Sequence, residues 1–167
     1  STLIKVLSAA YQPDEGEIFI RGELQYFASP LDPIAAGIGM VFPSFKLFPS
    51  LTIAENVVFR SEPTKRGLID RAAANRRVSD IAAQYGLAID PTQRVDSVPV
   101  GVLQRVEIVK ALYREARVLI LDEPTAVLVP DEVQALFATL RLLVGEGMAV
   151  VFISHKLAEV RAISQRV

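Results

Sequence analysis

Cysteine is absent from the 167 residues of this sequence. A disulfide framework and any metal site with cysteine ligands are therefore excluded, and the composition fits a reducing compartment. Charge of one sign is not in excess either, because 18 Lys and Arg stand against 19 Asp and Glu. Taken as a whole, the chain has no net field that would draw it onto nucleic acid or an anionic membrane.

Long apolar runs are also missing. A membrane-spanning helix needs about 18 apolar residues in a row, whereas the longest candidate, Met148 to Ile153, has the length of a buried strand. No signal-peptide pattern follows Ser1. An apolar helical pattern is already under way at Leu3 and Ile4, so we expect the chain to begin inside a longer domain.

The sequence alternates between strand patterns and helix patterns. Apolar or alternating runs predict strands at 17–21, 37–42, 118–121 and 149–153. Helical spacing predicts helices at 1–10, 70–85, 101–115 and 131–144, and two more that begin near 52 and 156. The helix near 52 starts with a capping box formed by Thr52 and Glu55. This alternation predicts an α/β fold with a mostly parallel sheet flanked by helices.

Two carboxylates, Asp122 and Glu123, follow the apolar run 118–121 directly. Parallel sheets bind ligands at the carboxyl ends of their strands, so we expect both acids in a crevice there. One acid can hold Mg²⁺ through water while its neighbour polarises an attacking water. A strand that ends in a solvated acidic turn would carry the same Asp-Glu-Pro sequence, so this motif alone leaves both interpretations open.

Two further motifs point to phosphate. His155, the only histidine, follows the strand 149–153 and would lie at the same sheet edge as a donor to a γ-phosphate. Alternatively, it is a structural histidine. The loop Val98 to Arg105 contains Gly101 and opens a helix, whose first N–H groups can bind phosphate, although most helices begin after a loop that binds nothing.

In order and spacing, these motifs resemble the ATP-binding subunits of ABC transporters over essentially the whole chain. Asp122 and Glu123 fall on Walker B and Ser154-His155 on the switch histidine. Three other segments are similar to the end of Walker A, the approach to the Q-loop and the helix behind the LSGGQ-type signature: Ser1 to Leu7, Gly37 to Val41, and Gln104 to Ile108. The segments Leu121 to Leu128 and Ile153 to Leu157 look most like those of simple-sugar or nucleoside importers.

The resemblance implies a P-loop NTPase-like α/β fold with a small antiparallel β portion and an inserted helical subdomain. It implies one partial domain over 1–167, in which 1–50 and 116–167 form the RecA-like core. Residues from about 51 to 115 would form the helical subdomain that carries the signature. The N- and C-terminal parts of such a domain are expected to be missing.

The resemblance also implies a site for ATP and Mg²⁺. Glu123 would orient or deprotonate water, and His155 would stabilise charge on the γ-phosphate. Ser1 and Asp122 would hold Mg²⁺. The residues expected to bind nucleotide are Ser1, Thr2, Asp122, Val100, Gly101 and Gln104.

The partners implied are a second nucleotide-binding domain, as a homodimer, heterodimer or tandem half, and transmembrane permease subunits. No nucleic acid is expected. The subunit would power import by ATP hydrolysis from the cytoplasmic face of the cell membrane, attached through the permease.

Several positions depart from the family pattern. Pro43 stands where the Q-loop glutamine is expected, and Pro99 replaces a signature serine whose hydroxyl would meet the γ-phosphate. Val102 and Leu103 stand where glutamines are common, and Val129 where a polar residue is common. The glycine loop and lysine of Walker A are absent as well. These departures predict a weakened or inactive ATPase.

Two other functions therefore stay open. One is a degenerate or partial domain that acts as a structural partner. The other is an ABC ATPase outside transport, such as a DNA-repair or translation factor, which would typically carry coiled-coil or basic insertions that are not visible here. An aromatic loop, Phe42, Phe45, Leu47 and Phe48, also has two interpretations: packing beneath the helical lobe, or a surface for a coupling helix of a permease.

Overall fold

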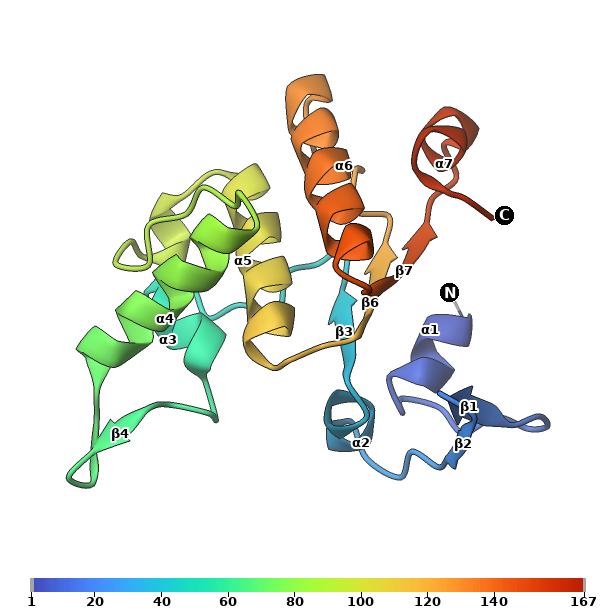
Figure 1. The fold of residues 1–167 in the computed structure, drawn as a ribbon, viewed down its shortest axis with the longest axis horizontal. Coiled ribbons are helices and arrows are strands. Elements are labelled where there is room, and N and C mark those ends of the chain that lie inside the picture. Colours follow the sequence, from blue (N-terminus) through green and yellow to red (C-terminus); the bar gives the residue numbers. More distant parts are fainter. Residues whose placement is uncertain (1, 167) are drawn as a thin grey trace.

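The computed structural model describes residues 2–166 of the chain (Figure 1). Helices and strands alternate along it in the following order: α1 (Thr2–Leu7), β1 (Ile18–Ile20), β2 (Glu23–Gln25), α2 (Leu31–Ala35), β3 (Ile38–Val41), α3 (Ile53–Val58), β4 (Thr64–Lys65), β5 (Leu68–Ile69), α4 (Arg71–Gln84), the 3-10 turn η1 (Val95–Ser97), α5 (Val100–Tyr113), β6 (Val118–Asp122), α6 (Pro130–Gly145), β7 (Ala149–Ile153) and α7 (Leu157–Ile163).

The three strands β3, β6 and β7 form a parallel sheet in that order, with β6 in the middle. Central strand β6 is the apolar run that the sequence predicted to be buried on both faces. Its residues Leu119, Ile120 and Leu121 are at most 2% exposed, which confirms that prediction. The α/β class with a parallel sheet is confirmed as well.

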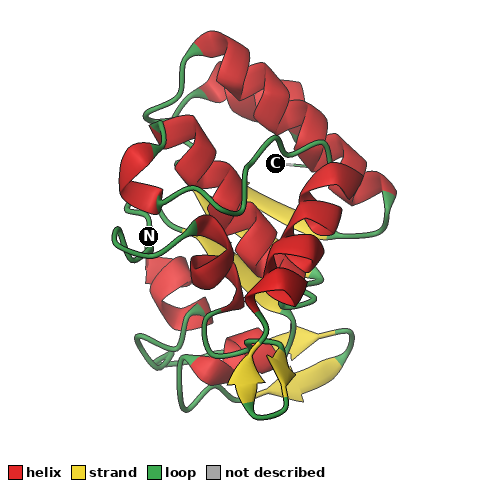
Figure 2. Cartoon of the chain, turned by 90° about the vertical axis from the view of Figure 1, so that its left-hand side faces the viewer, coloured by secondary structure: helices red, strands yellow, loops and turns green. Residues whose placement is uncertain are grey.

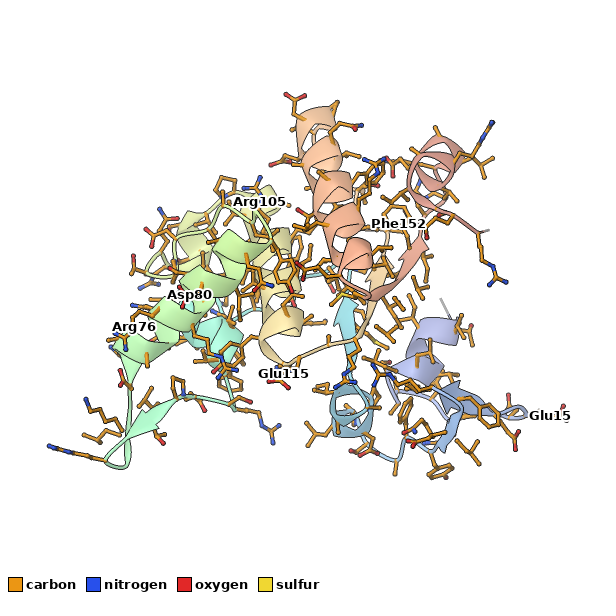
Figure 3. The ribbon with its side chains drawn as sticks, viewed as in Figure 1. Glu15, Arg76, Asp80, Arg105, Glu115 and Phe152 are labelled. Carbon is orange, nitrogen blue, oxygen red and sulfur yellow. The ribbon has the colours of Figure 1, made fainter. Side chains whose placement is uncertain are left out.

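Alternate residues of the sheet serve two different cores, as the two-residue period of a strand requires. Leu119 and Leu121 pack in the main core, which includes residues of α3, α4, α5 and α6. Ile38 and Ile120 point to the other face, where they meet Ile4 of α1. On the main-core side, Phe152 of β7, which is labelled in Figure 3, meets Phe137 of α6 edge to face, with ring centroids 5.8 Å apart.

Helices α3, α4 and α5, together with the loops between them, form what we call the helical lobe, at the left in Figure 1. Seen from that side, its helices lie in front of the parallel sheet (Figure 2). The predicted capping box is present, because Thr52 accepts from the Glu55 N–H and Glu55 accepts from the Thr52 N–H. Asp70 caps α4 in the same manner through the Ala73 N–H.

Five short elements were not predicted from the sequence: β2, α2, β4, β5 and η1. Each has at most five residues, too few for a hydrophobic period to show. Of the strands among them, β2 pairs with the predicted strand β1, and β4 pairs with β5, in two antiparallel hairpins. The small antiparallel portion expected of the fold is thus present.

None of the helices in the described part of the chain combines the length and the apolar character needed to cross a membrane. Strand β7 lies at an edge of the parallel sheet among residues 2–166, and its Val151 is 39% exposed.

Candidate functional site

Strands β6 and β7 bring Asp122, Glu123 and His155 to one edge of the sheet. Their register pairs Asp122 with Ile153, so both strands end at the same level. The Glu123 N–H donates to the Ile153 carbonyl at 2.9 Å, which extends the ladder by one bond beyond the strand. The two acids and the imidazole therefore follow neighbouring strand ends, as the sequence predicted.

The Glu123 carboxylate holds the histidine directly. Its Oε1 accepts from the backbone N–H of His155 at 2.9 Å and lies 2.9 Å from His155 Nδ1. The second oxygen, Oε2, is buried and has no hydrogen-bond partner among the described residues. Oε1 is thus bound to His155, and the Glu123 side chain as a whole remains 25% exposed.

Glu123 has a left-handed backbone, with φ of 48°. For a residue with a side chain this conformation costs about 1–2 kcal/mol. The hydrogen bonds to Ile153 and His155 offset that cost. The strained turn aims the carboxylate across to the neighbouring strand end instead of along its own strand.

A second polar cluster, not predicted from the sequence, joins the loops that carry these residues. The Thr125 hydroxyl, which is fully buried, donates to Glu159 of α7. The Lys156 ammonium lies 3.1 Å from Glu159 and donates to the Thr125 carbonyl at 3.2 Å. The loop after β6 is therefore fastened to the loop and helix after β7. The only signal in the sequence was the position of these three residues just past the two strand ends.

The residues predicted from the glycine-containing loop lie elsewhere. Val100, at the start of α5, is 42% exposed. Gly101 is buried against the Glu132 carboxylate of α6, so closely that an added Cβ would meet its Oε1 at 2.0 Å. Gln104 is 3% exposed, and its Nε2 has no partner among the described residues. With Gly101 and Thr139, it lines a cavity of about 230 Å³ between α5 and α6.

Among residues 2–166, these three residues form no hydrogen bond or ion pair with Glu123 or His155 through their side chains; Gly101 and Gln104 lie against α6 instead. The structure thus brings Asp122, Glu123 and His155 to one sheet edge, whereas Gly101 and Gln104 belong to the contact between α5 and α6. Thr2 opens α1 and is exposed, whereas Ser1 lies outside the described residues.

Pro43 lies in the exposed loop after β3, and that loop is tied to α5 beyond it. The buried Glu107 accepts from the Lys46 N–H at 2.8 Å and pairs with Lys110 at 2.6 Å. Lys110 in turn donates to the Lys46 carbonyl at 3.2 Å. Glu107 therefore links the loop to the helical lobe, a role the sequence did not reveal.

The aromatic loop is packed against the cores at some of its residues and exposed at others. Leu47 is half-buried against the main core, and Phe42 against the second core. Phe48 is 48% exposed, and its ring contacts that of Phe59 at a tilt of 48°, with ring centroids 4.9 Å apart. Phe42 and Leu47 therefore pack against the cores, whereas Phe48 forms part of an exposed apolar surface.

The carboxylates at this sheet edge suit a hard cation that also binds phosphate oxygens. Within residues 2–166 no three His, Asp or Glu residues are grouped to hold a metal by themselves. Asp122 and Glu123 supply carboxylate oxygens, one of them buried and unpartnered. Such a pair fits Mg²⁺, which keeps several waters and takes phosphate oxygens as further ligands.

Comparison with known proteins gives a consistent picture. The family model described as ABC transporter matches residues 1–126. The nucleoside import ATP-binding protein NupA of Lactococcus lactis is 40% identical over the whole chain, which covers 33% of that protein. The ribose import ATP-binding protein RbsA 1 of Rubrobacter xylanophilus is 46% identical over the whole chain, which covers 34% of it.

A third relative, the guanosine import ATP-binding protein NupO of Bacillus subtilis, is 47% identical over 90% of the chain and 30% of its own length. The chain thus spans about a third of the length of these relatives.

Two solved structures share the fold. A nucleotide-free ATP-binding cassette from an ABC transporter superposes with a TM-score of 0.79 at 19% identity, over 97% of this chain and 68% of that one. A dimeric bacterial ABC transporter cassette gives a TM-score of 0.75 at 24% identity, over 96% of this chain and 71% of that one. Since the family model covers three quarters of the sequence, the chain belongs to the ABC transporter family.

Proposed function

We propose that this chain is part of the ATP-binding subunit of an importer for simple sugars or nucleosides, and that the subunit hydrolyses ATP. The relatives are named for import of nucleosides, ribose and guanosine, which supports the substrate class. The contact between Glu123 and His155 at one sheet edge, next to Asp122, is the observation that carries the proposal. The contact joins Glu123, the proposed general base, to His155, the proposed hydrogen-bond donor to phosphate.

In this proposal Glu123 acts on the attacking water. Its carboxylate is held in place by His155 and is part of a side chain that is 25% exposed, so it can orient the water and accept its proton. The Nε2 atom of His155 donates to the γ-phosphate, where negative charge develops. Asp122 and the Ser1 hydroxyl would hold Mg²⁺, which neutralises phosphate charge when it is bound. Thr2 would contribute to the nucleotide site beside Ser1.

The start of α5 is proposed to act on a second nucleotide-binding domain. Val100 is 42% exposed, and Gly101 and Gln104 lie against α6. Pairing two domains head to tail would place this helix start against the ATP of the other domain. Closure on ATP and reopening after hydrolysis would then switch the permease between its two states.

We further propose that residues from about 51 to 115 form the helical subdomain, and that 1–50 and 116–167 form the core. The mutual packing of α3, α4 and α5 supports this division. The exposed pair Phe48 and Phe59 would receive the permease and hold the subunit at the cytoplasmic face of the membrane. Asn56 supports that surface, because its amide bonds both the N–H and the carbonyl of Phe48.

Replacement of Phe48 by Asp tests the permease surface. The variant should lose co-purification with the permease and keep its unfolding midpoint, because the ring is half exposed. Leu157→Asp, at a side chain that is 76% exposed on α7, is the matched control and should assemble normally. A loss of folding instead of assembly would place Phe48 in the core.

A degenerate domain that serves as a structural partner is the second candidate. It is favoured by Pro43, which supplies neither a side-chain carbonyl nor a backbone N–H, and by Pro99, which supplies no hydroxyl. Mg-ATP binding and ATPase activity of a chain extended upstream of Ser1 separate the two functions. Binding with turnover supports the ATPase, whereas absence of both supports the structural partner.

The two proline positions can be tested in the same extended protein. Restoring the family residues by Pro43→Gln and Pro99→Ser should raise the ATPase rate, if the two prolines weaken it. An unchanged rate would show that these departures are harmless.

A further inference from the structure

The β4–β5 hairpin extends from the helical lobe at the lower left of Figure 1, next to the start of α4. All six residues from 64 to 69 are exposed. Two of them are large aliphatic side chains: Leu68 is 76% exposed and Ile69 is 58% exposed. The chain therefore presents apolar surface to solvent at an outlying point, where it contributes little to either core.

The two aliphatic side chains lie on opposite faces of the hairpin. Leu68 pairs with Lys65, and Ile69 pairs with Thr64. Opposite residues of an antiparallel pair share a face, and successive residues alternate. Each face of this narrow hairpin thus carries one aliphatic side chain.

The tip itself is basic. Arg66 and Gly67 form the two-residue turn, and both have positive φ, of 54° and 79°. Turns of this kind favour Asn or Asp before Gly, because a left-handed backbone is unfavourable for longer side chains. Arg66 places a cation at the tip in spite of that preference, next to Lys65.

Positive charge continues around the hairpin. Residues 60–77 hold two carboxylates, Glu62 and Asp70, against six basic residues, a net charge of +4 within a chain of net charge −1. Both carboxylates accept hydrogen bonds from backbone N–H groups, of Arg60 and Ala73. Within residues 2–166 neither forms an ion pair. The basic residues are Arg60, Lys65, Arg66, Arg71, Arg76 and Arg77.

Some of these cations have partners that still leave their charge exposed. Arg71 pairs with Glu55 at 3.2 Å, yet its side chain is 79% exposed. Arg77 lies over the Tyr113 ring, 4.7 Å from its centroid. Figure 3 labels Arg76 on the first half of α4, the half nearer to the hairpin. Basic side chains therefore extend from the tip of the hairpin to α4, with the charge of Arg71 partly offset by Glu55.

We propose that this hairpin is a docking surface for the anionic headgroups of a phospholipid bilayer. Leu68 and Ile69 enter the boundary between headgroups and acyl chains, while Lys65, Arg66 and the arginines behind them bind the anionic lipids. Exposed aliphatic side chains beside cations favour lipid over nucleic acid, which offers no apolar layer. This function goes beyond ATP hydrolysis and adds a direct membrane contact to the attachment proposed through the permease.

Vesicle flotation of the chain tests the electrostatic part. At about 0.1 M salt, the chain should bind phosphatidylcholine vesicles with about one third phosphatidylglycerol, and bind pure phosphatidylcholine vesicles much less. The double variant Lys65→Gln and Arg66→Gln should lower the partition coefficient roughly tenfold or more. Arg161→Gln with Arg166→Gln removes the same charge at the C-terminal side and is the matched control. Equal losses in the two double variants would overturn the assignment.

Tryptophan fluorescence tests the apolar part, because the chain has no tryptophan. A Leu68→Trp variant should shift its emission to the blue on anionic vesicles and be quenched by brominated lipids. A Leu157→Trp variant is the control, since Leu68 and Leu157 are each 76% exposed. Failure of the first variant to respond, or an equal response of both, would overturn insertion of the hairpin.

An acidic protein surface is the competing partner for this patch. If polyglutamate bound to the hairpin while anionic vesicles did not, the lipid proposal would be wrong. Vesicle binding needs neither ATP nor a permease, so its outcome is independent of the proposed function. Circular dichroism of every variant verifies that each change leaves the fold intact.

Discussion

The carboxylate of Glu123 and the backbone of His155 are joined by a hydrogen bond of 2.9 Å across the ends of β6 and β7, and the same oxygen lies 2.9 Å from the imidazole Nδ1. Because one oxygen binds both the main chain and the side chain, the position of the histidine depends on the glutamate. Any change that moves the loop after β6 should therefore also move the imidazole.

Replacement of Glu123 by Gln should abolish ATP turnover and spare ATP binding. The amide oxygen can still accept from the His155 N–H, so the loop keeps its shape, but an amide cannot take a proton from water. We expect the hydrolysis rate to fall by about 10²–10⁴ in a full-length cassette. Steady-state hydrolysis and equilibrium ATP binding measure the two effects.

Glu115→Gln is the matched control for that variant. Glu115 is exposed and precedes β6, at the end of the strand opposite to Glu123 (Figure 3). Its replacement should leave turnover unchanged. Unchanged hydrolysis in the Glu123 variant would remove this carboxylate from the mechanism.

Thr125→Val should weaken the connection between the two loops. Valine keeps the shape of this fully buried side chain but removes the hydroxyl that binds Glu159. We expect the free energy of unfolding to fall by about 1–3 kcal/mol, because a largely buried carboxylate loses a donor. Urea unfolding measures the change, and Thr125→Ser, which keeps the hydroxyl, should lose less.

A double-mutant cycle with Glu159→Gln tests whether these residues act as a pair. Contacting partners should give a coupling energy of about 0.5–3 kcal/mol. Additive effects would mean that the hydrogen bond contributes nothing to stability.

Gly39→Ala should destabilise the contact between β3 and α5. An added Cβ would lie 2.7 Å from the Cβ of Ala111 and 3.0 Å from that of Ala116, so strand and helix must separate. Overpacking of this kind costs about 1–3 kcal/mol. Gly145→Ala is the control, because no atom lies within 4 Å of its added Cβ. That change, in α6, should raise stability by roughly 0.5–1 kcal/mol. Thermal or urea unfolding in which both variants behave alike would contradict the close approach.

Glu55 should make the helical lobe sensitive to acid. Its pKa is lowered from the ordinary value of 4.5, chiefly by the hydrogen bond from the Thr52 backbone N–H and further by the Thr52 hydroxyl and Arg71, while partial burial acts against them. The folded state thus favours the charged form. The resulting stabilisation is complete above about pH 4.5 and is lost as pH falls through the lowered pKa.

Unfolding free energies measured across this pH range test the assignment. The Glu55→Gln variant should show a shallower fall in stability below about pH 4.5 than the unaltered chain. Glu15→Gln, at an exposed turn carboxylate, should leave the slope as it was. A slope unaffected by both replacements would show that other carboxyls govern the acid response.

Local patterns account for what the sequence predicted well. The apolar run 118–121 indicated a strand buried on both faces, since no polar side chain interrupts it, and Thr52 with Glu55 indicated a helix start, since both partners lie within one turn. The β4–β5 hairpin was missed because strands of two residues carry no period. Short elements are recognised only through what they pair with.

The sequence alone determined which residues can bind a ligand or take part in a reaction, and that these residues lie at the ends of strands. From them followed the family, the α/β class and the expectation that Asp122, Glu123 and His155 share one sheet edge. Only the tertiary structure decided that Glu123 holds His155 through a left-handed turn, and that Thr125 reaches Glu159, 34 positions away. Those contacts depend on which strands become neighbours and at what register, and a linear pattern of residues does not encode distances between separate strands.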